Sequence, residues 1–141
     1  MEQPAGNKIT GNPSSHPALS VKWLEDFPDI PLNRNEAYKL RVTSKGVEIE
    51  AITETGVYRA IQTLRQLTEK KGNGIAITGC EITDWPAFRI RGFMQDVGRT
   101  YISTDELKRE IAILARYKIN VFHWHLTENQ AWRLQARCSQ C

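Results

Sequence analysis

The sequence contains no long hydrophobic run, and this absence excludes a helical membrane span. A helix that crosses a bilayer needs about 20 consecutive apolar residues, and no stretch of this 141-residue chain approaches that length. The N-terminal segment MEQPAGNKITGNPSSHPA also lacks the apolar core of a signal peptide. We therefore expect no signal peptide and no membrane partner. The sequence does not determine the cellular compartment, and a periplasmic or secreted parent protein is compatible with it.

Concentrated positive charge is missing as well. The formal net charge is +3, and the Lys and Arg residues are scattered, whereas nucleic-acid-binding surfaces gather them in a stripe or interleave them with aromatic residues. The sequence therefore predicts no nucleic-acid partner. Its hydrophobic content of 40% and charged content of 25% are those of a soluble globular protein.

Three cysteines do not make a disulfide framework. Cys80 lies in a β-like run, and we interpret it as a small buried hydrophobic residue. Cys138 and Cys141 form a C-x-x-C pair at the C-terminus. A redox pair would need a helix start beside it, and a zinc site would need two more ligands. We therefore predict that residues 136–141 form an unstructured tail.

The first part of the chain predicts strands. Residues 1 to about 19 are rich in Pro, Gly, Ser and Asn, which predicts a mobile arm, and residues 20–24 are a candidate short strand. Apolar and charged residues alternate over 36–43 and again over 47–51. This alternation predicts an antiparallel hairpin that turns at residues 44–46.

An amphipathic helix should follow, with Thr53 as its N-cap. The apolar stripe that should cover the hairpin sheet is Val57, Ala60, Ile61, Leu64 and Leu67. The segment KKGNG, residues 70–74, should end this helix, because cations favour the helix C-terminus and Gly favours the left-handed cap. Ile75, Ile77 and Ile82 indicate one further strand, which Asp84-Trp85-Pro86 ends.

The remainder is organised around the stretch from Arg89 to Arg133, which reads as strand, helix, strand. Residues 93–97 are typical of a buried strand, and residues 103–106 (STDE) form a capping box. An apolar helix side, Leu107, Ile111, Leu114 and Ala115, follows the box and runs out at Lys118. Residues 121–126 are a second β-type run. Parallel strands joined by a helix share one carboxyl edge, where function gathers; here it carries Asp96, Arg99, His125, Glu128 and Asn129.

The chain therefore divides at about residue 88, into a small α+β layer and the opening of a parallel α/β structure. Parallel strands are normally covered on both faces, and two of them cannot close a barrel. We expect either that more chain follows or that exposed strands support self-association.

Two runs in the second part, RGFMQDVGRTYIS and LARYKINVFHWHLTENQAWR, closely resemble the start of the catalytic barrel in family-20 glycoside hydrolases, the β-N-acetylhexosaminidases. The preceding EAYKLRVTSKGVEIEAITETGVYRAIQTLRQL resembles the end of the α/β domain before that barrel. The resemblance implies an α/β fold in which an α+β layer leads into the first βαβ unit of an incomplete TIM-type barrel. The implied parts are an arm (1–34), a partial non-catalytic domain (35–88), a truncated βαβ unit (89–135) and a tail (136–141).

The resemblance also implies an activity. Family members hydrolyse terminal N-acetylhexosamine residues of glycans with retention, by an exception to the two-carboxylate scheme: the sugar's own acetamido oxygen attacks the anomeric carbon. For this chain we expect no cofactor and no metal. An Asp orients the acetamido group, and the adjacent Glu is the general acid. The only Asp-Glu dipeptide here, Asp105-Glu106, belongs to a helix cap. We therefore expect no catalytic pair in this chain, and an inactive fragment.

Substrate-binding roles are carried over by the same resemblance. Arg91 would bind sugar hydroxyls, since a guanidinium holds two vicinal oxygens, with a salt-bridged strand-start Arg as the plainer interpretation. Glu128 stands where the family usually has Asp, in a carboxylate–His–Glu relay that tunes the general acid, with a solvated loop carboxylate as the alternative. Asn129 stands where a second Asp is common. Together, Arg91 and Glu128 should form one wall of the pocket.

Four further residues are expected near this site. Trp132 is a candidate sugar-stacking ring, although packing is the commoner role of such a Trp. Asp96 should be a buried, paired carboxylate that holds the loops, because a buried unpaired charge is costly. Arg99 and His125 are expected beside it as structural residues.

Two rival interpretations remain. His123-Trp124-His125 places two imidazoles on one side of a strand, as in metal-dependent barrel hydrolases, but no third ligand has a supporting spacing. The other rival is a non-catalytic α/β module.

Overall fold

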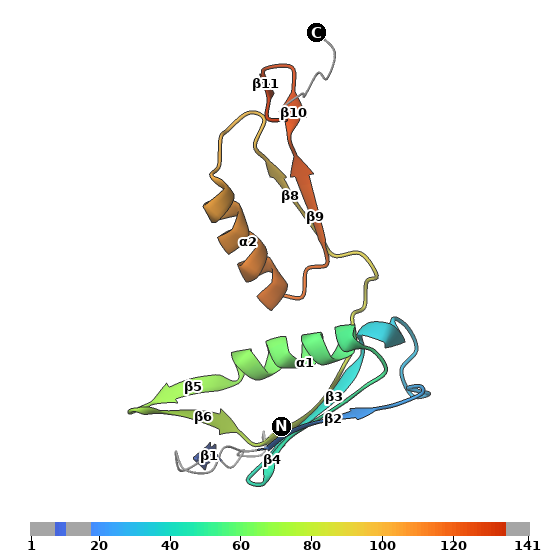
Figure 1. The fold of residues 1–141 in the computed structure, drawn as a ribbon. Coiled ribbons are helices and arrows are strands. Elements are labelled where there is room, and N and C mark those ends of the chain that lie inside the picture. The colour runs from blue at the N-terminus through green and yellow to red at the C-terminus, as the bar shows by residue number, and fades with distance from the viewer. Residues whose placement is uncertain (1–7, 11–17, 135–141) are drawn as a thin grey trace, which may run out of the picture. The chain divides into compact units, whose positions relative to one another are not determined.

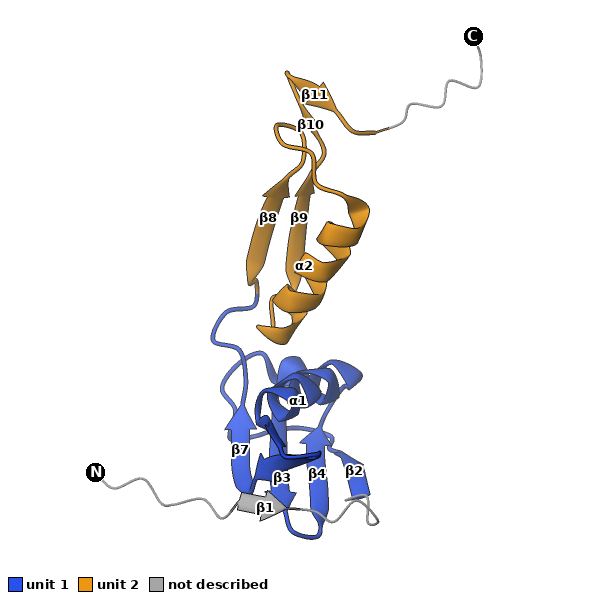
Figure 2. Cartoon of the chain, turned by 90° about the vertical axis from the view of Figure 1, so that its left-hand side faces the viewer, with its two compact units in different colours: residues 1–89 blue, residues 90–141 orange. Residues whose placement is uncertain are grey.

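The computed structural model describes residues 8–10 and 18–134 of the chain. The chain divides into two compact units, residues 1–89 and residues 90–141, which Figure 2 shows in different colours.

A four-stranded sheet in the order β2-β4-β3-β7 is the base of the first unit (Figure 1). Strands β3 (Tyr38–Thr43) and β4 (Gly46–Ala51) pair antiparallel, which confirms the predicted hairpin. β2 (Ala18–Trp23) pairs parallel with β4, and β7 (Cys80–Asp84) pairs antiparallel with β3. Cys80 is only partly buried, against the core of this sheet, and this burial raises the pKa of its thiol.

Helix α1 (Glu54–Gln66) covers one face of that sheet (Figure 1). The Thr53 hydroxyl accepts a hydrogen bond from the Gly56 amide, as predicted for the N-cap. All five residues of the predicted stripe pack into the core, whose buried members are Tyr38, Leu40, Val42, Val47, Ile49, Ala51 and Ala60. The Tyr38 hydroxyl donates to Asp84 Oδ2 (2.9 Å), so this buried polar group is satisfied.

The helix does not end at residues 70–74 as predicted. It ends at Gln66, and a hairpin of β5 (Thr68–Lys71) and β6 (Gly74–Thr78) follows. Gly72 has the left-handed φ of +60° at the turn. A helix cap and a tight turn require the same backbone freedom of Gly, so the KKGNG pattern alone did not separate them.

Two more expectations need correction. The single strand expected over residues 75–82 is two strands, β6 and β7, in different sheets. The predicted mobile arm includes β1 (Lys8–Thr10), which pairs antiparallel with β6, and the start of β2, because ladder hydrogen bonds hold the backbone irrespective of composition. The rest of the arm and the tail with Cys138 and Cys141 lie outside the described residues.

Between β2 and β3, the short 3-10 helix η1 (Arg34–Glu36) leads into the hairpin. A second, smaller core of Phe27, Ile30 and Ala37 lies under this connection, with Leu24, Ile52 and Trp85 packed against it.

The second unit is a βαβ unit (Figure 1). Strands β8 (Gly92–Asp96) and β9 (Val121–His125) pair parallel on either side of helix α2 (Thr104–Arg116) in the chain. Ser103 and Glu106 form the predicted capping box. Of the predicted apolar side of α2, Leu107 is buried, Leu114 and Ala115 are half-buried, and Ile111 is exposed. A short hairpin of β10 (Thr127–Glu128) and β11 (Ala131–Trp132) follows β9.

Within the described residues, α1 and α2 have 13 residues each, and no helix there is long and apolar enough to cross a membrane.

The core of the first unit generates a stability prediction. Ile49 is 0% exposed, and Ile49→Ala should lower the free energy of unfolding by about 2–5 kcal/mol, because it removes apolar contacts and leaves a cavity. Native-state hydrogen exchange at the amides of β3 and β4 measures this value. The matched control is Ile75→Ala, at a residue that is 67% exposed; an equal effect of the two substitutions would contradict the assignment of the core.

Candidate functional site

The carboxyl ends of β8 and β9 meet at one edge of the second unit. The pair is parallel, and its last register position joins Asp96 to His125. Figure 1 shows both strands running toward the end where the β10–β11 hairpin begins. The polar residues that the sequence predicted at this edge therefore follow two strand ends that lie side by side.

Asp96 holds the loop that follows β8. Its Oδ1 accepts hydrogen bonds from the backbone amides of Gly98 (2.8 Å) and Arg99 (3.1 Å), and its Oδ2 pairs with Arg99 Nε. The Asp96 side chain is 16% exposed and that of Arg99 is 59% exposed. One carboxylate thus fixes both the loop backbone and the base of an exposed guanidinium.

These contacts change the acidity of the pair. The hydrogen bond from the Arg99 side chain, followed by that from the Arg99 amide, lowers the pKa of Asp96 from 3.8 to about 2. The Asp96 carboxylate in turn raises the pKa of Arg99, and the charge of Glu128 adds to that effect. The pair is therefore fully charged at any pH near neutrality.

Glu128 lies directly beside this loop. A Cβ atom placed on Gly98 would lie 3.2 Å from Glu128 Cβ and 3.2 Å from Asp96 Oδ1, so the loop backbone passes against both residues. The carboxylate of Glu128 is exposed and accepts a hydrogen bond from the Asn129 amide (3.2 Å). Arg99 and Glu128 thus belong to one edge.

Arg91 does not belong to that edge. It directly precedes β8, and its Nε donates to the carbonyl of Lys118 (2.8 Å), while its amide donates to Asn120 Oδ1 (2.9 Å). These contacts hold it at the amino end of the strands, roughly 15 Å from the carboxyl end at about 3.3 Å per residue. The prediction that Arg91 and Glu128 form one wall therefore does not hold, because the start and the end of a strand lie at opposite edges.

The two histidines of β9 offer little to a metal. The rings of His123 and His125 are 6.2 Å apart between centroids, edge to face. His125 Nδ1 is buried, 3.5 Å from Asp96 Oδ1, and has no hydrogen-bond partner in the described chain. Across residues 8–10 and 18–134, no group of three His, Cys, Asp or Glu side chains is arranged to hold a metal ion.

Trp132 stands opposite Thr127 in the β10–β11 hairpin. Its side chain is 67% exposed, so its ring is accessible on the hairpin that carries Glu128.

Arg133 also lies at this edge, although no pattern in the sequence predicts a role for it. Its Nε donates to the carbonyl of Val97 (2.9 Å), its Nη2 to that of Gly98 (3.4 Å), and its guanidinium lies 5.7 Å from the centre of the Tyr101 ring. In the sequence, Arg133 stands out only as a positively charged residue directly after the hairpin. It belongs to no catalytic motif.

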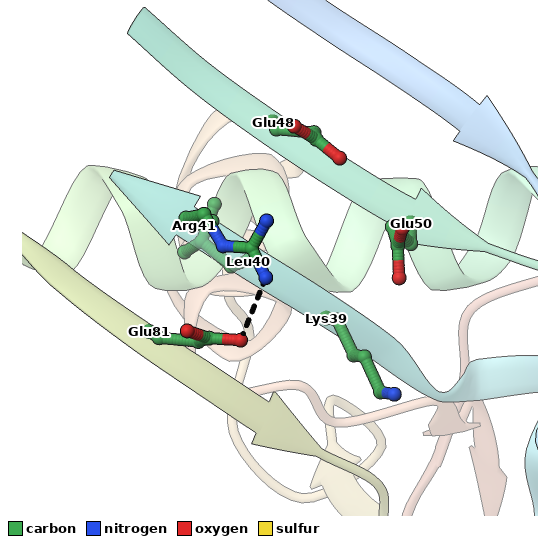
Figure 3. A pocket seen from close by; sticks show the side chains of 6 residues that line it. All are labelled: Lys39, Leu40, Arg41, Glu48, Glu50 and Glu81. Carbon is green, nitrogen blue, oxygen red and sulfur yellow. Dashed lines mark hydrogen bonds and ion pairs between the residues drawn. The ribbon is translucent and has the colours of Figure 1, made fainter. Parts of the chain in front are cut away.

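A shallow hollow lies on the outer face of the first unit's sheet (Figure 3). Its lining residues are Lys39, Leu40, Arg41, Glu48, Glu50 and Glu81. Arg41 pairs with Glu81 at 3.0 Å and Lys22 with Glu50 at 2.8 Å. Ion pairs across a solvated sheet face explain this hollow without a ligand.

Comparisons with known proteins match both units. The model of "Glycosyl hydrolase family 20, domain 2" matches residues 4–85, and that of "Glycosyl hydrolase family 20, catalytic domain" matches residues 88–139. A β-hexosaminidase of Porphyromonas gingivalis is 42% identical over 96% of this chain and 17% of its own length. A β-N-acetylhexosaminidase of Cellulomonas fimi is 40% identical over 83% of this chain and 24% of its own.

Solved structures agree. An exo β-N-acetylglucosaminidase from Vibrio harveyi, in complex with N-acetylglucosamine, superposes with a TM-score of 0.71 at 37% identity, covering 81% of this chain and 17% of that one. A Streptomyces plicatus N-acetyl-β-hexosaminidase gives 0.70 at 32% identity, covering 81% and 23%. The chain thus spans less than a quarter of the length of these proteins.

The Asp96–Arg99 pair makes a prediction about pH. A carboxyl NMR titration should give Asp96 a pKa of about 2. Arg99→Gln should move this pKa up toward 3.8, because it removes the largest cause of the shift, whereas Arg109→Gln, at an exposed arginine of α2, should not. A pKa of Asp96 that is unchanged by Arg99→Gln would refute the pairing.

The sign of the effect on stability follows from the same shift. Since the pKa is lower in the folded state, the pair stabilises the fold fully above about pH 4, and this stabilisation is lost as the pH falls toward about 2.

Proposed function

Because the chain belongs to glycosyl hydrolase family 20, we propose that it supplies part of the sugar-binding site of a β-N-acetylhexosaminidase. Residues 35–88 would belong to the non-catalytic α/β domain and residues 89–135 to the first βαβ unit of a TIM-type barrel. The whole enzyme would remove terminal N-acetylhexosamine residues from glycans, with retention, by the substrate-assisted route. The observation that carries the proposal is the edge where Asp96 holds Arg99 and Gly98 packs against Glu128.

We assign to Arg99 the sugar-binding role that the family resemblance implies for Arg91. Barrel enzymes bind substrate at the carboxyl ends of their strands, and of these two arginines only Arg99 stands there. Asp96 engages Arg99 through Nε, which leaves the two Nη groups to a ligand. A planar pair of donors suits two vicinal sugar hydroxyls, and the fixed base reduces the rotamer entropy lost on binding.

Glu128 would act as the relay carboxylate. A carboxylate that accepts a hydrogen bond from an imidazole fixes its tautomer and favours its cation, and in this family such a chain tunes the general acid. Glu128 is exposed at the edge and so is available to a partner group. Trp132 would offer a face for stacking against a sugar ring.

The reacting pair of the family is not among these residues. Asp105-Glu106 is the one Asp-Glu dipeptide in the sequence, and the Glu106 side chain accepts hydrogen bonds from Ser103 at the start of α2. These 141 residues would therefore bind and orient the sugar without catalysing its hydrolysis. By themselves they would behave as a non-catalytic α/β module, with self-association through the exposed strands as an expected side effect.

Turnover of a chromogenic N-acetylglucosaminide tests both parts of the proposal. The protein made from the complete gene should hydrolyse it, and the 141-residue chain should not. No turnover by the former would refute the activity, and turnover by the latter would refute the division of roles.

The two arginines provide a sharper test in the protein made from the complete gene. Arg99→Gln should lower kcat/KM by about 10- to 100-fold, the effect of losing hydrogen bonds from a charged group. Arg91→Gln should change it by less than about threefold, because Arg91 contacts a backbone carbonyl at the other edge. Circular dichroism checks that both variants fold. The reverse order of effects would restore the assignment to Arg91.

Metal removal separates the proposal from the rival metal-dependent hydrolase. Dialysis against EDTA should leave turnover unchanged, because His123 and His125 have no third ligand among the described side chains. Loss of turnover that returns on adding Zn²⁺ would favour the rival, and elemental analysis of the untreated protein supplies the metal content.

A further inference from the structure

We propose that Arg133 is a positioning residue, which ties the loop after β8 to the β10–β11 hairpin and so fixes the spacing between Arg99 and Glu128. This inference rests on the proposed sugar site, because it concerns the two residues that would face the sugar.

The contacts of Arg133 join two segments, because its carbonyl partners Val97 and Gly98 lie 36 and 35 residues before it in the chain. Its side chain donates to the carbonyls of Val97 (2.9 Å) and Gly98 (3.4 Å), and its own amide donates to the carbonyl of Leu126 (3.1 Å). Val97 and Gly98 connect Asp96 to Arg99, and Leu126 lies just before β10. Arg133 is therefore hydrogen-bonded to the loop through its side chain and to the start of the hairpin through its backbone amide.

Burial makes these bonds costly to lose. Val97 is 3% exposed, and a buried carbonyl without a donor loses its solvation with no compensation. The Val97 amide is already bonded to the carbonyl of His125 (3.0 Å). Arg133 completes this backbone position, and it does so at the point where Gly98 meets Glu128.

The geometry favours arginine over lysine. Two successive carbonyls are reached by Nε and Nη2 of one rigid plane, whereas a lysine ammonium would act as a single flexible point charge. The face of the Tyr101 ring, 5.7 Å from the guanidinium carbon, adds a contact suited to a planar cation. We therefore expect lysine to replace Arg133 only in part.

A double-mutant cycle in the protein made from the complete gene separates positioning from general structural support. The probe is N-acetylglucosamine, and its Kd is measured by calorimetry for the wild type, Arg133→Gln, Arg133→Lys, Arg99→Gln and the double variant Arg99→Gln/Arg133→Gln. Arg109→Gln is the matched control, an exposed arginine of the same unit.

If Arg133 acts through Arg99, Arg133→Gln weakens binding by about tenfold and Arg133→Lys by less. The double variant then binds within about twofold of Arg99→Gln alone, because the positioned group is already gone. Arg109→Gln leaves the Kd unchanged. Binding by Arg133→Gln that equals the wild type, or losses that simply multiply in the double variant, would overturn the inference.

A measurement without ligand keeps this inference separate from the proposed function. In Arg133→Gln, or in Arg133→Lys to a smaller degree, the amides of Gly98 and Arg99 should exchange with solvent faster, while those within β8 stay protected. A wild-type protein that does not bind N-acetylglucosamine would refute the sugar site alone. Unchanged exchange at Gly98 and Arg99 would refute the positioning role.

Discussion

The parallel pairing of β8 with β9 is the constraint from which the site follows. Each strand brings one polar loop, and parallel pairing requires both loops to emerge at the same edge. An antiparallel pair would send Arg99 and Glu128 to opposite ends, whatever their chemistry. The helix between the strands makes this arrangement possible, because a parallel connection needs a crossover. The capping box of Ser103 and Glu106 fixes where that helix begins and so where the first loop ends.

Within that edge, charge is balanced locally. Asp96 accepts a hydrogen bond from one cationic side chain, Arg99, on Oδ2 and from two backbone amides on Oδ1. A carboxylate with this many donors stays ionised, so it holds the arginine without competing for protons in the neutral range. The side chain of Arg99 is 59% exposed, so part of its guanidinium is open to solvent. The two loops are then joined by the backbone bond from the Val97 amide to the His125 carbonyl and by the bonds from the Arg133 guanidinium to the carbonyls of Val97 and Gly98.

Local patterns in the sequence predicted local structure well. Alternation identified β3 and β4 because one face of that hairpin is buried against α1, and both N-caps were visible as residue types at fixed spacing. β5 was missed because its residues, TEKK, are exposed throughout, and a strand without a buried face has no alternation. The prediction that Arg91 shares an edge with Glu128 was wrong for a different reason. The motif R-G-x-x-x-D-V-x-R contains an arginine at each end of a strand, and sequence order alone does not say which one lies at the carboxyl edge. Arg133 was overlooked because its partners are carbonyl groups, which leave no mark in a sequence.

The size of the residue at position 98 affects the distance between the two loops but not the charged groups that they carry. A methyl group at this position would meet a carboxylate oxygen of Asp96 and the Cβ of Glu128 at 3.2 Å each, closer than most such contacts, so its neighbours would have to yield slightly. A side chain at position 98 would push the two loops apart without removing the charge of Asp96 or of Glu128. The length of the Glu128 side chain and the size of the residue at position 98 thus both affect the space between the two loops. A change in either alters the space left for a ligand.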